Sequence, residues 1–222
     1  MRLRIALLAV SILCALALPW PSAGGAAERP LKEQVEAGRH LFDARGCSTC
    51  HAVKGRGGQE VRGKLRGPDL TRVTVYASAL LGASVMWNHV PLMEEAMREQ
   101  GLAWPLFRDS ELSDLFTYLH SLNVRGGSSY AFQGDARLGA ILFGATCQKC
   151  HGPVGKGGRL GPDLAPVAAS MLGEEEFAGR MLRHAPTMVS MAREAKLTWP
   201  TLSGAEMANI LAYMRSLRPK AN

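Results

Sequence analysis

Cysteine is scarce in this sequence, and its few copies have restricted positions. Five cysteines occur among 222 residues: Cys14 lies in an N-terminal apolar segment, and the other four form two close pairs. If both pairs serve one chemistry, only Cys14 is left over, so no two cysteines remain to form a structural disulfide. The chain is therefore not a disulfide-stabilised scaffold.

Long basic runs and strand-like patterns are also absent. The formal net charge is +7, but the basic residues are scattered and are not interleaved with aromatic residues. A nucleic-acid partner is therefore not expected, because such surfaces gather their positive charge on one face. No segment sustains the alternation of apolar and polar residues that is typical of strands. The predicted fold class is all-α.

A histidine directly follows each cysteine pair. Residues 47–51 read Cys-Ser-Thr-Cys-His, and residues 147–151 read Cys-Gln-Lys-Cys-His. Cys-x-x-Cys-His is the attachment signature of c-type haem: the two thiols bond the two vinyl groups of one porphyrin, and the histidine ligates its iron. The two pentads predict two covalently attached haem c groups, held by Cys47, Cys50, His51, Cys147, Cys150 and His151.

A Cys-x-x-Cys pair also occurs in zinc sites and in thioredoxin-like redox centres. A zinc site needs four nitrogen or sulfur ligands, and His51 cannot easily join Cys47 and Cys50 on one metal ion. A thioredoxin-like centre needs a strand before the motif and a helix after it, and neither copy has this context. The haem interpretation is therefore favoured over both alternatives.

The N-terminal segment has the pattern of a secretory signal peptide. Arg2 and Arg4 precede an apolar run over residues 5–18, and the small-residue stretch that follows ends in Gly-Ala-Ala. Cleavage is expected after Ala27 or one residue earlier. An apolar run of about 14 residues is short for a membrane span, which needs about 20, although an uncleaved anchor stays an alternative. We therefore expect export to the periplasm, where c-type haem is attached.

The remainder of the sequence is an internal duplication. A Gly-Pro-Asp-Leu segment follows each pentad, and the His-x-Pro-x-Met, Trp-Pro and C-terminal segments recur at a constant offset of 95 residues. A Gly- and Ser-rich stretch separates the two copies,. The predicted boundaries are a signal peptide over residues 1–27, a first domain over 28–123, a linker over 124–134 and a second domain over 135–222.

Each copy resembles a class I cytochrome c domain. The resemblance rests on the order of an N-terminal helix with Gly38 and Phe42, the pentad, Gly-Pro-Asp-Leu, a methionine and a C-terminal helix over residues 111–122. It implies that Gly38 and Phe42 pack on the C-terminal helix near Leu115 and Tyr118, and that the second copy does the same. The tandem arrangement resembles dihaem cytochromes of the c4 type.

The resemblance also implies how each iron is held. His51 and His151 are the expected proximal ligands, and the carbonyls of Pro68 and Pro162 are expected to accept their imidazole N–H groups.

The distal ligands must recur in both copies. Met86 with Met181, Met93 with Met188, and His89 with His184 meet this requirement. We favour Met93 and Met188, because each follows a proline by two residues, as in the proline-rigidified ligand loop of the family. The other two pairs stay alternatives.

Two six-coordinate haems leave no position for a substrate, so the expected function is outer-sphere transfer of single electrons, without a small-molecule substrate. The expected partners are other periplasmic or membrane-bound redox proteins. A haem enzyme of the dihaem peroxidase or thiosulfate-oxidising type is the main alternative, but it needs one haem with an open or displaceable ligand. A cytochrome subunit of a dehydrogenase complex is a further alternative that differs in partner and not in chemistry.

Overall fold

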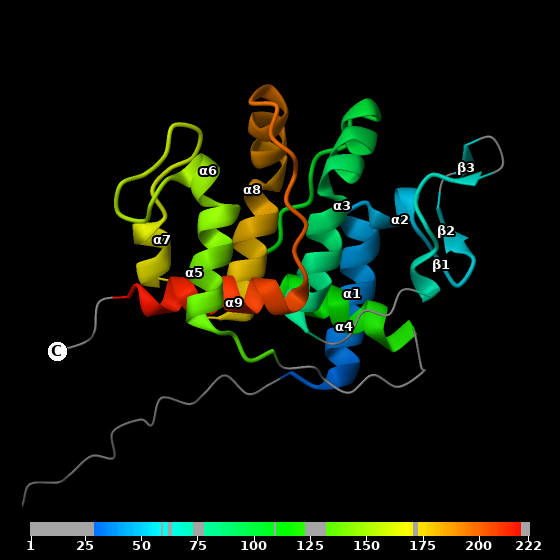
Figure 1. Cartoon of the computed structure of the whole chain (residues 1–222). Coiled ribbons are helices and arrows are strands. Elements are labelled where there is room, and N and C mark those ends of the chain that lie inside the picture. Colours follow the sequence, from blue (N-terminus) through cyan, green and yellow to red (C-terminus); the bar gives the residue numbers. More distant parts are fainter. Residues whose placement is uncertain are drawn as a thin grey trace, which may run out of the picture.

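The protein consists of two similar helical halves that lie side by side (Figure 1). The computed structural model describes residues 29–58, 60–61, 64–72, 78–108, 110–122, 132–170 and 173–218. The helices of the first half are α1 (Leu31–Ala44), α2 (Cys47–Cys50), η1 (Leu70–Arg72), α3 (Ala79–Glu99) and α4 (Glu111–Leu122). Those of the second half are α5 (Ala136–Ala145), α6 (Gln148–His151), α7 (Ala165–Ser170), α8 (Glu174–Glu194) and α9 (Gly204–Ser216). The predicted all-α fold class is confirmed.

Some of the predicted segments fall outside this description. The predicted signal peptide, residues 1–27, lies outside the described residues, and so do residues 124–131 of the predicted linker. The domain boundaries that depend on these segments stay predictions. Within the part of the chain that the structure describes, no helix combines the length and apolar character needed to cross a membrane.

The first and last helices of each half cross at a glycine. A Cβ atom on Gly38 of α1 would lie 1.9 Å from the Asp114 carbonyl oxygen, and one on Gly139 of α5 would lie 1.9 Å from that of Asn209. Only a hydrogen atom fits between the helices at these two points. This confirms that the glycine-containing helix of each copy packs on the C-terminal helix.

Aromatic pairs close the same crossings, as the resemblance predicted. The ring centroids of Phe42 and Tyr118 are 5.9 Å apart, and those of Phe143 and Tyr213 are 5.3 Å apart. Both separations are within the range of favourable tilted ring pairs. The two halves therefore share one core design, with α1 on α4 in the first and α5 on α9 in the second.

Side-chain caps fix where several helices begin. The Asp135 carboxylate accepts hydrogen bonds from the backbone N–H groups of Arg137 and Leu138 at the start of α5. Ser203 and Glu206 form a reciprocal capping box at the start of α9,.

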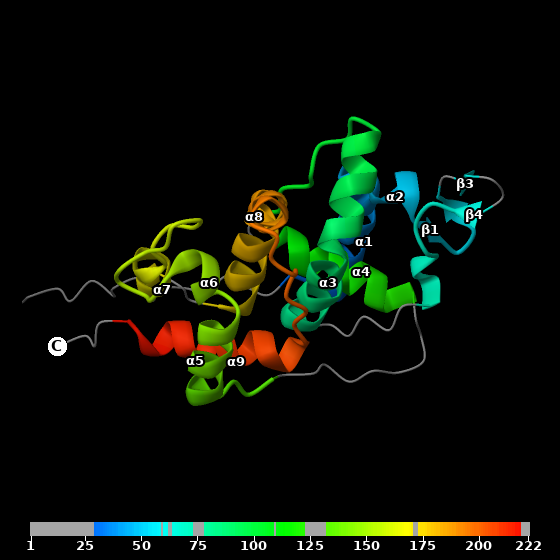
Figure 2. The ribbon, with the colours of Figure 1, turned by 45° about the horizontal axis from the view of Figure 1, so that its top comes forward.

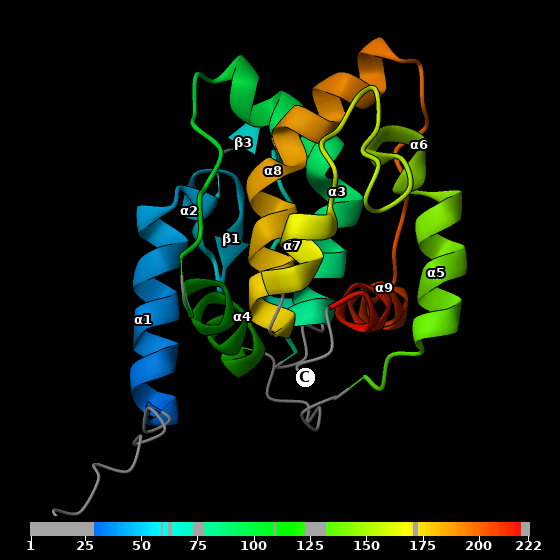
Figure 3. The ribbon, with the colours of Figure 1, turned by 90° about the vertical axis from the view of Figure 1, so that its left-hand side faces the viewer.

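Two helices of 21 residues, α3 and α8, occupy the centre of the molecule and pack against each other (Figures 1 and 3). The expectation that Met93 and Met188 lie in proline-containing loops is wrong. Both lie inside these long helices, together with Pro91 and Pro186. A proline removes one helical hydrogen bond, but here the helix continues on either side of it.

The segment after the first pentad contains short strands, although no segment of the sequence sustains the alternation that is typical of strands. β1 (Ala52–Val53) pairs with β2 (Arg56–Gly57), and β3 (Glu60–Val61) pairs with β4 (Lys64–Leu65). Lys54 and Gly55 have φ angles of 48° and 72°, as required by the tight turn of a two-residue hairpin. Figure 2 shows these strands at the outer edge of the first half, away from the second.

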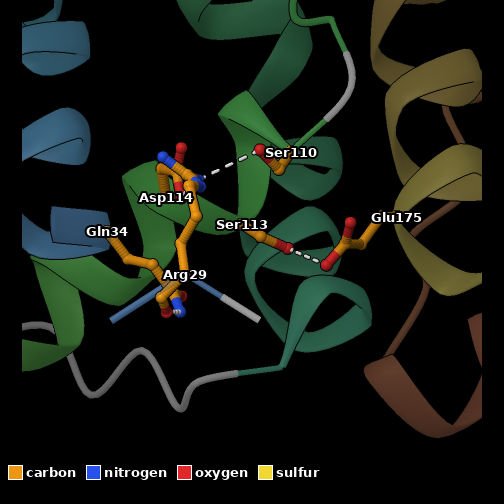
Figure 4. A network of polar contacts seen from close by, with 6 residues as sticks. All are labelled: Arg29, Gln34, Ser110, Ser113, Asp114 and Glu175. Atoms are coloured by element: carbon orange, nitrogen blue, oxygen red, sulfur yellow. Dashed lines mark hydrogen bonds and ion pairs between the residues drawn. The ribbon is translucent and has the colours of Figure 1, made fainter. Parts of the chain in front are cut away.

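Polar contacts surround α4 on two sides (Figure 4). The buried carboxylate of Asp114 pairs with the Arg29 guanidinium, which also donates to the Ser110 hydroxyl at 3.1 Å. On the other side, the Ser113 hydroxyl donates to the carboxylate of Glu175. Since Glu175 belongs to α8, the second contact joins the two halves.

The glycine crossing in α5 gives a direct test of this packing. We expect Gly139→Ala to lower the free energy of unfolding by about 1–3 kcal/mol or more, because the new methyl group meets a backbone carbonyl that cannot move without shifting α9. Gly144→Ala, in the same helix, is the matched control. Its Cβ would meet only the Gln148 Oε1 atom, at 3.7 Å, so it should be neutral or stabilise by up to about 1 kcal/mol. Denaturant unfolding of the intact protein measures both, and equal effects would contradict the crossing.

Candidate functional site

Both pentads lie where the first helix of each half ends. In the first half, Gly46 takes a φ angle of 76° and starts the turn that contains Cys47 and Cys50. In the second half, Cys147 occupies the N-cap position of the short helix α6. The local folding therefore places the two thiols of each pair on one turn, next to a histidine.

The first cysteine of each pair is strongly shielded from water. Burial raises the pKa of the Cys47 thiol to about 11 and also raises the pKa of Cys147. In both cases the cause is burial, which disfavours the charged thiolate. Within the described residues, no group of three or more His, Cys, Asp or Glu side chains is arranged to hold a metal ion. The structure thus gives no support to the zinc alternative.

Each pentad histidine is oriented by a proline carbonyl. His51 Nδ1 lies 2.9 Å from the carbonyl oxygen of Pro68, and His151 Nδ1 lies 3.0 Å from that of Pro162. A carbonyl can only accept, so Nδ1 carries the hydrogen and Nε2 keeps its lone pair. This is the tautomer that a metal-binding imidazole needs, and the contact predicted with each proline is confirmed.

The glycine before each of these prolines lies against the imidazole ring. A Cβ atom on Gly67 would lie 2.7 Å from the His51 ring, and one on Gly161 would lie 2.6 Å from His151 Nδ1. A larger residue would push the ring away from its position. The Gly-Pro pair therefore does two things at once: the glycine gives the ring room, and the proline carbonyl fixes its rotation.

The aspartate after each of these prolines holds the loop. The Asp163 carboxylate accepts hydrogen bonds from the backbone N–H groups of Gly155 at 2.8 Å and Ala165 at 3.0 Å. These hydrogen bonds lower the pKa of Asp163. In the first half, the Asp69 carboxylate accepts a hydrogen bond from the Thr71 backbone N–H at 2.8 Å. The glycine, proline and aspartate of the Gly-Pro-Asp-Leu motif thus each have a defined role.

A cavity of about 1240 Å³ opens above the pentad of the second half. Its volume exceeds the range of about 300–1,000 Å³ that is usual for small-molecule sites. It is lined on one side by the pentad and its Gly-Pro loop, and on the other by α8. An apolar, porphyrin-sized space that contains both thiols and a histidine with a free Nε2 fits a covalently bound haem.

The α8 face of the cavity contains every distal ligand candidate of that half. Met181, His184 and Met188 all line it, and so does Met191, which has no counterpart in the first half. Their spacing puts the four side chains on one face of a helix. The cavity is therefore compatible with a distal ligand from α8, and the choice of Met188 within that face stays a prediction.

The candidate histidines already make one hydrogen bond within their helices. His89 Nδ1 lies 2.7 Å from the Val85 carbonyl oxygen, and His184 Nδ1 lies 2.9 Å from that of Arg180. Each bond leaves Nε2 as the free nitrogen. His184 lines the same cavity as Met188, so the two histidines stay alternatives to Met93 and Met188.

The sequence did not show that the first half contributes to this cavity. Trp87, Phe107 and Leu112 line it alongside the residues of the second half. The Trp87 ring also packs on that of Trp199, with centroids 4.3 Å apart. Nothing in the sequence of a single repeat reveals a contact with the other repeat.

Acid stability should depend on the loop below His151. Because the pKa of Asp163 is lowered from 3.8 in the folded protein, its two hydrogen bonds stabilise the fold above that pH and are lost as the pH falls through the lower, folded value. Asp163→Asn keeps an acceptor oxygen but cannot titrate. We expect the variant to lose less stability than the native protein between pH 5 and pH 2, measured by thermal unfolding. Parallel pH profiles would contradict this role.

Comparison with known protein families agrees with this division into halves. The sequence matches the family model described as Cytochrome c twice, over residues 35–123 and over residues 136–218. Each match contains one pentad and one long proline-containing helix. No curated protein matches the chain.

Proposed function

Because the chain belongs to the cytochrome c family, we propose that it is a periplasmic dihaem carrier, with a c4-like tandem arrangement, that passes single electrons between redox partners by outer-sphere transfer. Haem-based electron transfer follows from the family. The observation that supports a carrier is the equivalence of the two halves. Each has a cysteine pair on one turn, a histidine tied to a proline carbonyl, and a helix with a methionine at the same offset.

Different residues would attach each haem and ligate its iron. Cys47 with Cys50, and Cys147 with Cys150, would attach the porphyrins, while His51 and His151 would ligate from the proximal side. We assign the distal positions to Met93 and Met188. When bound, each haem c supplies an iron that gains and loses one electron. The apolar walls and the methionine sulfur favour the reduced state, because both disfavour additional positive charge.

A catalytic haem would need asymmetry between the halves. A dihaem peroxidase or a thiosulfate-oxidising cytochrome requires one iron with a displaceable ligand and an acid–base residue above it. Among the described residues, His184 is the only histidine that α8 contributes to the cavity of the second half, and His89 lies at the equivalent position of α3. This equivalence favours the carrier. A role as the cytochrome subunit of a dehydrogenase complex uses the same chemistry.

The proposed location and partners follow from the sequence at the N-terminus and from the cysteines. Residues 1–27 have the pattern of an export signal, and every cysteine after them belongs to a haem motif. Partners would be periplasmic redox proteins or membrane-bound oxidases and dehydrogenases. An acidic docking surface on the partner would complement the positive net charge of this chain.

Ligand substitution tests the assignment. We expect Met93→Ala and Met188→Ala each to convert one of the two haems to high spin, to remove half of the near-infrared charge-transfer band of methionine-ligated ferric haem, and to lower one of the two reduction potentials. The matched controls are Met86→Ala and Met181→Ala, which should leave the band intact. If the controls lose the band and the other variants keep it, the ligands are Met86 and Met181.

The count and reactivity of the haems test the function itself. A pyridine haemochrome assay should return two haems per chain, and a redox titration should show two one-electron steps. Neither ferric haem should bind cyanide rapidly at neutral pH, nor should the protein consume peroxide, because both distal positions are occupied. Rapid cyanide binding to one haem, together with peroxide turnover, would favour the enzyme.

A further inference from the structure

Each of the two central helices contains a backbone carbonyl that its own helix cannot satisfy. In an α-helix, the carbonyl of residue i accepts from the N–H of residue i+4. The N–H partner of the Trp87 carbonyl would belong to residue 91, and that of the Leu182 carbonyl to residue 186. Both positions are prolines, which have no N–H,. Trp87 and Leu182 are themselves buried, so water does not readily replace the missing donor.

A tryptophan from the opposite half supplies the missing donor in each case. The indole N–H of Trp199 donates to the Trp87 carbonyl at 2.9 Å, and the indole N–H of Trp104 donates to the Leu182 carbonyl at 2.8 Å. Trp104 lies in the loop between α3 and α4, and Trp199 lies in the loop between α8 and α9. Each loop therefore reaches across to the central helix of the other half.

Neighbouring contacts repeat the same exchange. The Asn88 amide donates to the Leu202 carbonyl at 3.1 Å and accepts from the Leu202 backbone N–H at 2.8 Å. Arg183 and Phe107 are the counterparts of Asn88 and Leu202 at the offset of 95 residues. The guanidinium of Arg183 donates to the Phe107 carbonyl at 3.2 Å. The two sets of contacts are thus related by a pseudo-twofold axis between α3 and α8, and neither set is isolated.

The helices that receive these bonds are the ones that close the haem sites. Met181, His184 and Met188, on either side of the Leu182 carbonyl, line the second cavity. We propose that Trp104 and Trp199 are positioning residues that act on the opposite half. Each donates a hydrogen bond to the carbonyl that the proline of the opposite distal helix leaves without an N–H partner, and so holds that helix in place. Each haem site is thus completed by the other half. The haem readouts below rest on the proposed function, but the bond and its stability test do not.

A double-mutant cycle tests the proposal on the intact protein. Trp104→Phe keeps an aromatic ring and removes the N–H, which leaves the Leu182 carbonyl buried without a partner. We expect the thermal midpoint to fall by about 2–10 °C. Pro186→Ala returns a backbone N–H to that carbonyl. In the Pro186→Ala background, Trp104→Phe should therefore lower the midpoint by less than half as much.

The other proline provides the matched control. Pro91→Ala restores a donor to the Trp87 carbonyl, which Trp104 does not contact. Trp104→Phe should therefore lower the thermal midpoint by as much in the Pro91→Ala background as in the native protein. The reciprocal pair, Trp199→Phe with Pro91→Ala, repeats the test on α3 and keeps it decisive if a variant on the other side fails to fold. Equal losses in all three backgrounds would overturn the proposal.

Hydrogen exchange shows which helix each tryptophan holds. Peptides resolved by mass spectrometry should show faster exchange in α8 after Trp104→Phe, and faster exchange in α3 after Trp199→Phe. The Met188→Ala variant identifies which step of the redox titration belongs to the haem of the second half. Trp104→Phe should shift the reduction potential of that haem, and Pro186→Ala should reverse the shift. Faster exchange confined to the half that contains the substituted tryptophan would refute action in trans. If exchange crosses over while the protein contains no haem, the positioning stands and the proposed function fails.

Discussion

The two central helices depend on each other because each contains a proline in the middle of its length. Pro91 and Pro186 remove one hydrogen bond each from α3 and α8, and each buried carbonyl that results accepts a hydrogen bond from across the interface. A helix of 21 residues with a proline near its middle would be weakened if it stood alone. Here, packing of α3 on α8 and donation from the two indoles compensate for that loss, and both helices remain continuous.

The parts of the structure that could be predicted from the sequence are those whose cause is local. The pentads, the proline carbonyl that orients each histidine, and the crossing at Gly38 depend on residues within one repeat. The capping serine of α9 is equally local. The pentads and the capping serine follow from spacing and from the chemistry of single residues. The proline carbonyl contact and the crossing at Gly38 were implied by the resemblance to class I cytochrome c domains.

The features that escaped prediction have causes in the other repeat. The helical state of the segments around Met93 and Met188 could not be read from the sequence, because a proline inside a segment normally argues for a loop or a helix end. The donor that makes the helix possible is Trp199 for one segment and Trp104 for the other. Each lies far away in the chain and is not distinguishable by sequence from a core tryptophan. The choice among the methionines of α8 is unsettled for a related reason, since several share one face of that helix.

The reciprocity of the interface has a consequence for the origin of the chain. An interface in which residue i of one unit meets residue j of the other, and j meets i, is the kind formed by two identical subunits about a twofold axis. The donor positions 104 and 199, and the acceptor positions 87 and 182, are related by the same offset of 95 residues. Two copies of a single-domain ancestor could thus have formed these bonds as a homodimer before gene fusion joined them. Fusion would then have allowed each copy to diverge. Trp87 is an example: its indole donates to the Pro200 carbonyl, whereas the equivalent position in the second copy is a leucine.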